Sequence, residues 1–360
     1  MGTHVLFGSG ALNGLGDAAR DLGFRRTLLV TDPGLPALRD RAATELLNAG
    51  ISVHPYSRFG VNPDAAMAED GRVFAEPLGL DSVVALGGGS ALDIAKAINF
   101  LVTNGGRMQD YRGYGKVARP LLPAIGIPTT AGTGSEAQSY CVIADPETHM
   151  KMACGDPSAA FRVAILDPDL TASAPRDVRA AAGIDAAAHA IETLVTKRRS
   201  PISRALSLEA WRLIAPSLLT AVADARDAGA RADMLLGAHF AGAAIEASML
   251  GAAHACANPL TARYGTVHGI ALGILVPHVV RWNAHAVAKD YDAFGGAEKI
   301  ASLIEQARDA AGFPATLRAL GAKEADLEDL AMLAATQWTG TFNPRDLGAA
   351  GAMEIYKAAY

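Results

Sequence analysis

Four residues in the second half of the chain have the types and spacing of one divalent-metal site. Asp185 and His189 stand four apart in GIDAAAHAIE, an Ala-rich stretch without proline. On a helix, side chains four residues apart leave the same face, so these two can share one ion. His254 and His268 follow in AAHACANPLTARYGTVHG, where we expect a proline-containing turn to bring a second helix end toward the first pair. One carboxylate and three imidazoles suit Zn²⁺ or Fe²⁺ and predict a Lewis acid rather than a structural clamp.

The alternative to a metal site is that these histidines are ordinary packed residues. The chain has nine histidines, and a single histidine in an apolar helix is more often part of the core than a ligand. Two segments upstream favour a metal site over ordinary packing. Each has features of a nucleotide-binding turn or loop, which points to an enzyme.

The first of these segments, DSVVALGGGSALDIAKAINF, predicts a strand, a glycine turn and a helix. Residues 82–86 are apolar and β-branched, Gly87 to Gly89 break the run, and Ser90 opens a segment with helical spacing. Such a junction offers backbone N–H groups and the positive end of a helix dipole to a pyrophosphate. The glycines match neither G-x-G-x-x-G nor a Walker loop, so the pattern alone also allows a tight turn without a ligand.

The second segment, LLPAIGIPTTAGTGSEAQSY, predicts a buried strand over residues 121–127 and then a loop of glycines and hydroxyl side chains. Small residues directly after a strand let a nucleotide approach closely, and threonine hydroxyls can bond its phosphates and ribose. The alternative is a solvated, turn-rich loop.

The order of the expected elements divides the chain in two. Strands in RTLLVTD, SVVALGGGS, LLPAIGIP and VAILDP alternate with helical segments up to about residue 167, and Ala/Leu-rich helical patterns follow. We therefore predict an α/β domain over residues 1–173 and a helical domain over 174–360. In the second domain, Ser200 is expected to cap a helix with Pro201 in its first turn. Further on, residues 312–314 should separate a helix from a short one.

Composition restricts the class of protein. With 360 residues and 50% apolar content, the chain can bury a core in each of two domains. A formal net charge of −5 argues against a nucleic-acid or anionic-membrane partner. The cysteines Cys141, Cys154 and Cys256 are odd in number and lack metal spacing, which suits free thiols in a reducing cytoplasm. No run approaches the roughly 18 apolar residues of a membrane span, and the first residues lack the pattern of a signal peptide. We expect a soluble, cytoplasmic protein.

The combined motifs resemble a known family. GGGSALDIAK, PTTAGTGSE, the Asp185/His189 pair with the two later histidines, and Asn343-Pro344-Arg345 stand in the order and at the distances seen in the iron-containing (group III) alcohol dehydrogenases. The resemblance runs from FGSGAL to NPR and so covers essentially the whole chain. It implies an α/β nucleotide-binding domain, an all-helical C-terminal metal domain and a cleft between them, similar in fold to dehydroquinate synthase. It also implies a homodimer.

The resemblance assigns roles to individual residues. Asp32, after an early strand, would face the adenosine ribose, where a carboxylate accepts from the 2′-hydroxyl and repels a 2′-phosphate; this favours NAD over NADP. A turn-capping role for Asp32 is the alternative. The other implied coenzyme residues are Asn62 beside the adenine, Gly88, Gly89 and Ser90 at the pyrophosphate, Thr129, Thr130 and Thr133 along the phosphates and nicotinamide ribose, and Lys151 at a ribose hydroxyl.

One catalytic position departs from the family pattern. Many members carry a second histidine one helical turn after the first metal histidine of this segment, placed to relay a proton, and here that position is Asn258. Asparagine can orient a water or a substrate but cannot titrate. Proton exchange must then use solvent, ribose hydroxyls or another group, or the substrate differs from a simple primary alcohol.

The predicted function is metal-dependent hydride transfer between NAD(H) and a small alcohol, aldehyde or ketone. A lyase of the dehydroquinate-synthase kind, which uses the nucleotide as a transient oxidant, is the alternative from another class, and a maleylacetate-reductase-like enzyme is a nearer one. Neither the substrate nor the choice between Fe²⁺ and Zn²⁺ follows from the sequence.

Overall fold

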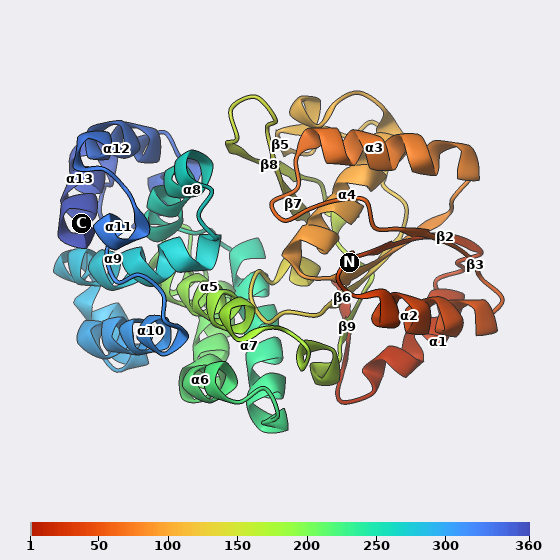
Figure 1. Ribbon diagram of the computed structural model, residues 1–360, viewed down its shortest axis with the longest axis horizontal. Coiled ribbons are helices and arrows are strands. Elements are labelled where there is room, and N and C mark those ends of the chain that lie inside the picture. Colours follow the sequence, from red (N-terminus) through yellow and green to blue (C-terminus); the bar gives the residue numbers. More distant parts are fainter. Residues whose placement is uncertain (1) are drawn as a thin grey trace. The chain divides into compact units, whose positions relative to one another are not determined.

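The computed structural model describes residues 2–360, which form two compact units (Figure 1). Of the described residues, the first unit comprises those up to Thr130 and Ser135–Ala172, and the second comprises Ala131–Gly134 and Ser173–Tyr360. The chain therefore passes from the first unit to the second after Thr130, returns at Ser135, and passes over again after Ala172.

The first unit is built on a six-stranded parallel sheet. Its strand order is β1-β9-β6-β4-β2-β3. The strands are β1 (His4–Phe7), β2 (Arg26–Thr31), β3 (Ser52–Tyr56), β4 (Ser82–Gly87), β6 (Ala124–Pro128) and β9 (Val163–Leu166). Strand β3 lies on one side of β2 and β4 on the other, so the order reverses between β2 and β4. In open α/β sheets, ligands bind at the carboxyl ends of the strands at such a reversal.

Helices cover both faces of this sheet. Helices α1 (Leu15–Asp21) and α2 (Pro36–Asn48) pack on one face, and α3 (Ala65–Ala75) and α4 (Gly89–Asn104) pack on the other. Alternate residues of β2 divide between the two cores: Leu29 packs with α1 and α2, whereas Leu28 and Val30 pack with α3 and α4. A smaller sheet in the same unit has the order β5-β8-β7, with β5 (Gly113–Tyr114), β7 (Tyr140–Ala144) and β8 (Lys151–Gly155).

The four strands expected from the sequence are the central strands β2, β4, β6 and β9. Strand β6 begins at Ala124, three residues later than the expected run, and α4 begins at Gly89, one residue before Ser90. The edge strands β1 and β3 did not stand out in the sequence. The reason is their composition, since neither is buried along its whole length and β3 contains a proline.

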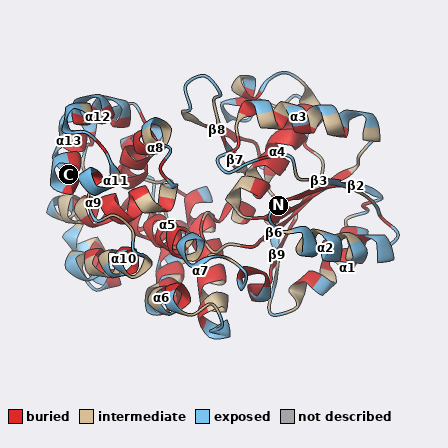
Figure 2. Cartoon of the chain, viewed as in Figure 1, coloured by how far each residue is buried: buried red, intermediate tan, exposed pale blue. Residues whose placement is uncertain are grey.

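The second unit is helical, and α5 (Arg176–Val195) runs through its centre. From Ala180 almost every residue of α5 is buried (Figure 2), and it packs against α6, α7, α9 and α10. The remaining helices are α6 (Pro201–Ala223), α7 (Ala228–Glu246), α8 (Ala252–Tyr264), α9 (His268–Tyr291), α10 (Ala297–Ala311), α11 (Leu317–Leu320), α12 (Leu327–Ala335) and α13 (Gly348–Ala359). The predicted cap of α6 is confirmed, because the Ser200 side chain accepts a hydrogen bond from the Ser203 N–H, and the predicted break lies between α10 and α11.

Contrary to the expectation from the sequence, helix α6 has the length and apolar composition of a membrane span. It is the one such helix among residues 2–360. Half of its most apolar stretch is buried, and it packs against α5 and α7. It thus has the features of a core helix in a bundle.

Candidate metal centre and nucleotide turn

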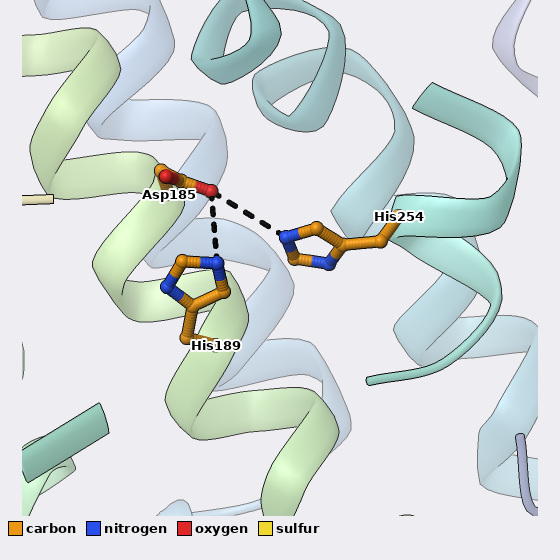
Figure 3. A group of neighbouring side chains, drawn as sticks. All are labelled: Asp185, His189 and His254. Carbon is orange, nitrogen blue, oxygen red and sulfur yellow. Dashed lines mark ion pairs between the residues drawn. The ribbon is translucent and has the colours of Figure 1, made fainter. Parts of the chain in front are cut away.

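Three of the four predicted metal ligands lie together. Asp185 and His189 leave the same face of α5, and α8 brings His254 to them, so that one ligand atom from each residue lies within 4.8 Å of the others (Figure 3). The Asp185 Oδ1 atom lies 3.2 Å from His189 Nε2 and 3.4 Å from His254 Nε2. All three residues are buried.

The chemistry of these atoms fits a bound cation. Within residues 2–360, Asp185 Oδ1 and His254 Nε2 are buried and make no hydrogen bond. Burying such atoms costs free energy unless they are hydrogen-bonded or coordinate a metal. One carboxylate oxygen and two imidazole nitrogens converging on one point form a nitrogen- and oxygen-rich site of the kind that Zn²⁺ and Fe²⁺ use.

His268 lies beside this group. It is the first residue of α9, and its ring centroid is 5.2 Å from that of His254. It is not among the three residues whose ligand atoms converge. Its part as a fourth ligand therefore stays a prediction.

The connection between the two later histidines differs from the expected proline turn. Pro259 lies inside α8, and the helix continues to Tyr264. The turn comes at Gly265, whose positive φ of 64° ends the helix in the left-handed conformation that favours glycine. Gly265, and not Pro259, thus separates the helix of His254 from that of His268.

Glu192 is a buried residue of the centre that the sequence did not single out. It lies on α5, seven residues after Asp185 and three after His189, and so on the same helix face. Its Oε2 atom is 2.6 Å from His254 Nδ1. The same carboxylate accepts hydrogen bonds from the backbone N–H groups of Gly251 (3.0 Å) and Ala253 (2.6 Å), at the start of α8. The helical spacing of the Asp, His and Glu in DAAAHAIE, which places all three on one helix face, was the signal in the sequence that could have identified Glu192.

The ionisable groups of the centre shift one another strongly. Burial alone would raise the pKa of the Asp185 carboxyl, but the neighbouring His189, His254 and His268 hold it well below its usual range. Burial lowers the pKa of His189 to about 4. Burial also acts to lower the pKa of His254, but Glu192 and Asp185 outweigh it and raise the value to about 9.

Asn258 lies one turn after His254 on α8. Its side-chain amide donates a hydrogen bond of 3.1 Å to the Gln337 side chain. Gln337 directly precedes the short 3-10 helix Trp338–Phe342. At the position of the family's relay histidine, this chain thus has an asparagine paired with a glutamine. A catalytic role for Asn258 remains a prediction.

In the first unit, the glycine turn lies at the reversal of the strand order. Gly87 has a φ of 150°, and a Cβ atom there would lie 2.6 Å from Ala91 Cβ and 3.1 Å from Asp32 Cβ. Gly88 precedes α4 without any side chain capping the helix. The N-terminus of this 16-residue helix is therefore arranged to receive an anion.

Other predicted coenzyme residues gather around this turn. Asp32 follows β2, and Thr129 and Thr130 follow β6, the strands on either side of β4. The Thr129 N–H donates to the Gly87 carbonyl at 2.9 Å, and the Thr130 hydroxyl would lie 3.3 Å from a Cβ at Gly88. Asp32 Oδ1 accepts from the Gly34 N–H at 2.8 Å, so this residue also caps its own turn.

The remaining three predicted coenzyme residues belong to other segments of the chain, and their roles stay predictions. Thr133 belongs to the segment Ala131–Gly134, which groups with the helical unit. Asn62 has a positive φ of 52° and precedes Pro63, whose carbonyl accepts from the Ala144 N–H. Lys151 pairs with Ala144 in the small sheet.

A buried lysine of the GGGSALDIAK motif holds the chain that follows the threonine loop. Lys96 is 3% exposed, and its ammonium group donates to the carbonyl oxygens of Ser135 (2.8 Å), Gln138 (2.7 Å) and Tyr140 (2.7 Å). One turn earlier on α4, the Asp93 carboxylate accepts from the Ser135 hydroxyl at 2.6 Å and from the Val142 N–H at 3.2 Å. Both residues therefore position residues 135–142.

Comparisons with known proteins agree along the whole chain. The family profile described as iron-containing alcohol dehydrogenase matches residues 2–168, and the profile of the C-terminal domain of that family matches residues 179–360. Lactaldehyde reductase of Escherichia coli (strain K12) is 33% identical, over 98% of this chain and 97% of its own. NAD-dependent methanol dehydrogenase of Bacillus methanolicus is 32% identical, over 94% and 93%. The crystal structure of a 1,3-propanediol oxidoreductase superposes with a TM-score of 0.93 and 33% identity, over 99% of this chain and 98% of that one.

Proposed function

Because the chain belongs to the iron-containing alcohol dehydrogenase family and is an NAD-linked alcohol oxidoreductase, we propose that it interconverts short alcohols and their aldehydes or ketones. The reaction would use a divalent cation, Fe²⁺ or Zn²⁺, held by Asp185, His189 and His254. His268 is proposed as the fourth ligand. The relatives act, by their names, on methanol, lactaldehyde and 1,3-propanediol, and this supports substrates of one to three carbons.

The observation that carries this proposal is the convergence of buried donor atoms without hydrogen-bond partners at Asp185 and His254. When bound, the cation would supply Lewis acidity to the oxygen of the alcohol or carbonyl, and the nicotinamide coenzyme would exchange the hydride. The three ligands are buried in the helical unit, which limits the contact of bulk water with their side chains.

The first unit supplies the coenzyme side of the reaction. The uncapped N-terminus of α4 and the glycines before it would bind the pyrophosphate through backbone N–H groups. Thr129 and Thr130 stand next to this turn, where their hydroxyl groups can bond phosphate or ribose oxygens.

The proton of the alcohol must leave by another route than Asn258, because an amide side chain cannot accept it. The Asn258 amide is hydrogen-bonded to Gln337 and can orient a hydroxyl group or a water molecule beside His254. We therefore propose that solvent or ribose hydroxyls exchange the proton.

Metal-stripped protein is tested with a panel of short aldehydes, ketones and oxo acids, and we expect no NADH oxidation with any of them. Turnover should return when Fe²⁺ or Zn²⁺ is added. NADH absorbance measures the rate, and comparison of the two ions at equal occupancy assigns the metal. Tight NAD binding without net redox on any substrate would contradict the proposal and favour the lyase alternative.

The proposed preference for NAD rests on Asp32. Substitution Asp32→Ser is expected to raise kcat/KM for NADPH relative to NADH by about 10- to 100-fold, because removing a like-charge contact of roughly 1.5–3 kcal/mol corresponds to that ratio. The serine hydroxyl can still accept from the Gly34 N–H and so preserve the turn. An unchanged ratio would mean that Asp32 serves the turn alone.

We also propose that the enzyme is a cytoplasmic homodimer. The three buried free cysteines support a reducing compartment, and the dimer rests on the family resemblance. Light scattering on the purified chain, and fractionation of cells that express it, test the two statements.

A further inference from the structure

The start of α8 is capped by side chains from other parts of the helical unit. Glu192 accepts hydrogen bonds from the N–H groups of Gly251 and Ala253. The Asn343 side-chain carbonyl accepts from the N–H between them, that of Ala252, at 3.1 Å. These three N–H groups belong to the set that a helix cannot bond internally, so the two side chains satisfy the helix end.

Gly251 is required for this arrangement. A Cβ atom at position 251 would lie 2.8 Å from the Asn343 side-chain oxygen and 3.1 Å from Glu192 Oε1. No larger residue leaves room for both acceptors. The close approach of the backbone at the start of α8 to both side chains thus depends on glycine at this position.

Asn343 belongs to the NPR motif and is held in turn by a second amide. Its oxygen also accepts from the Asn283 side chain at 3.0 Å, and its nitrogen donates to the Asn283 oxygen and to the Arg345 carbonyl, both at 2.7 Å. Within residues 2–360, Asn343 forms hydrogen bonds with Ala252, Asn283 and Arg345 and none with His254, so it caps α8 without bonding to the metal ligand.

Glu192 differs from Asn343 because it reaches the ligand ring itself. Its carboxylate lies at His254 Nδ1, and the opposite nitrogen, Nε2, faces Asp185 Oδ1. A carboxylate accepts only, so this contact keeps a proton on Nδ1 and leaves the lone pair of Nε2 for a cation. It also makes the imidazole a stronger donor.

We propose that Glu192 is a positioning residue for the metal: its carboxylate fixes the orientation and the tautomer of the His254 ring through Nδ1, while it anchors the start of the helix that carries this ring. The proposal rests on the proposed function, since it presupposes that the centre binds a cation.

The test compares Glu192→Gln with Asn343→Ala in the 360-residue chain. Glutamine has nearly the same shape but replaces one carboxylate oxygen with an NH₂ group. If this group faces Nδ1, it also opposes the Gly251 N–H and moves the ring proton to Nε2. If it faces the Ala253 N–H instead, the oxygen at Nδ1 belongs to a neutral amide, which is a weaker acceptor than a carboxylate. Zn²⁺ affinity, measured by competition with a chelator, is expected to fall about 10- to 100-fold in Glu192→Gln. Asn343→Ala should lower the unfolding temperature of the metal-free protein and change Zn²⁺ affinity by about threefold at most.

Unchanged Zn²⁺ affinity in Glu192→Gln would overturn the proposal, as would equal losses in both variants, which would trace the effect to the helix end. The visible spectrum of Co²⁺-loaded protein adds a readout of the ligands, and it should change in Glu192→Gln only. Selective ¹⁵N labelling of the histidines in the Zn²⁺-loaded natural chain needs no variant of Glu192: a proton found on Nε2 of His254 would also refute the assignment. If the natural chain itself bound no metal, the proposed function would fail instead.

Discussion

Substitution Asp185→Ala is expected to abolish metal retention and to reduce NAD-linked turnover by about 1000-fold or more. Asp185 Oδ1 lies between the Nε2 atoms of His189 and His254, at 3.2 and 3.4 Å, and is the anionic donor of the three-residue group. A Lewis acid contributes several kcal/mol to stabilising the charge on a reacting oxygen, and each 1.4 kcal/mol corresponds to about a tenfold rate. Elemental analysis after dialysis and initial rates with saturating NADH measure the two effects.

Asp177→Ala is the matched control for this experiment. Asp177 is an exposed carboxylate in the first turn of the same helix, two turns before Asp185. Its loss should leave metal content and turnover unchanged, because it contacts none of the ligands. Full metal content and turnover in Asp185→Ala would contradict both the site and the proposed function.

Substitution Lys96→Met is expected to destabilise the chain by about 3–5 kcal/mol and to weaken NAD binding. The change leaves the buried Asp93 carboxylate without its nearby cation and three backbone carbonyls without their donor, and breaking a buried charge pair from one side has a cost of this size. Residues 135–142 would lose their anchor on α4, directly after the threonine loop. Denaturant unfolding and NAD titration measure the two effects.

Two further variants sharpen this result. Lys116→Met removes an exposed lysine of the same unit and should alter stability by no more than about 0.5 kcal/mol. In the double variant Lys96→Met/Asp93→Asn, part of the lost stability should return, because no unpaired carboxylate remains buried. An unfolding midpoint for Lys96→Met equal to that of the natural chain would show that the ammonium group is not needed.

The sequence predicted the parts of the fold that have the strongest physical signal. Strands buried on both faces are largely apolar, and for this reason β2, β4, β6 and β9 were recognisable as nearly continuous apolar runs. The edge strands β1 and β3 carry exposed residues, and Pro55 interrupts the pattern of β3. Their place in the sheet follows from pairing with β9 and β2, which a local pattern does not contain.

The candidate metal centre was predictable to a similar degree. The spacing of Asp185 and His189 followed from helical geometry, whereas the approach of His254 depends on how α8 packs, which spacing does not reveal. Pro259 was interpreted as a turn because proline usually ends a helix, yet α8 continues through it. Glu192 escaped notice because a glutamate on a helix is ordinarily a solvated residue, and its burial comes entirely from tertiary contacts.

The glycines of PTTAGTGSE also have a role that the pattern did not contain. A Cβ atom at Gly132 would lie 2.8 Å from Ala182 Cβ on α5, and one at Gly134 would lie 2.6 Å from the Cα atom of Gly242 on α7. Gly134 also has a positive φ of 61°. These residues were interpreted as making room for a nucleotide, and they also allow backbone to pack against the helices of the second unit.

The grouping of Ala131–Gly134 with the helices limits how this enzyme can be recombined with its relatives. A chimera joined at Ala172/Ser173 would look like an exchange of whole halves, but it would combine the loop of one parent with the α5 and α7 surfaces of the other. Gly134 and Gly242, which meet backbone to backbone, must therefore be inherited as a pair. Gene fusions that respect this rule would carry residues 131–134 together with the C-terminal half, so the unit of exchange is discontinuous in the gene although it is continuous in space.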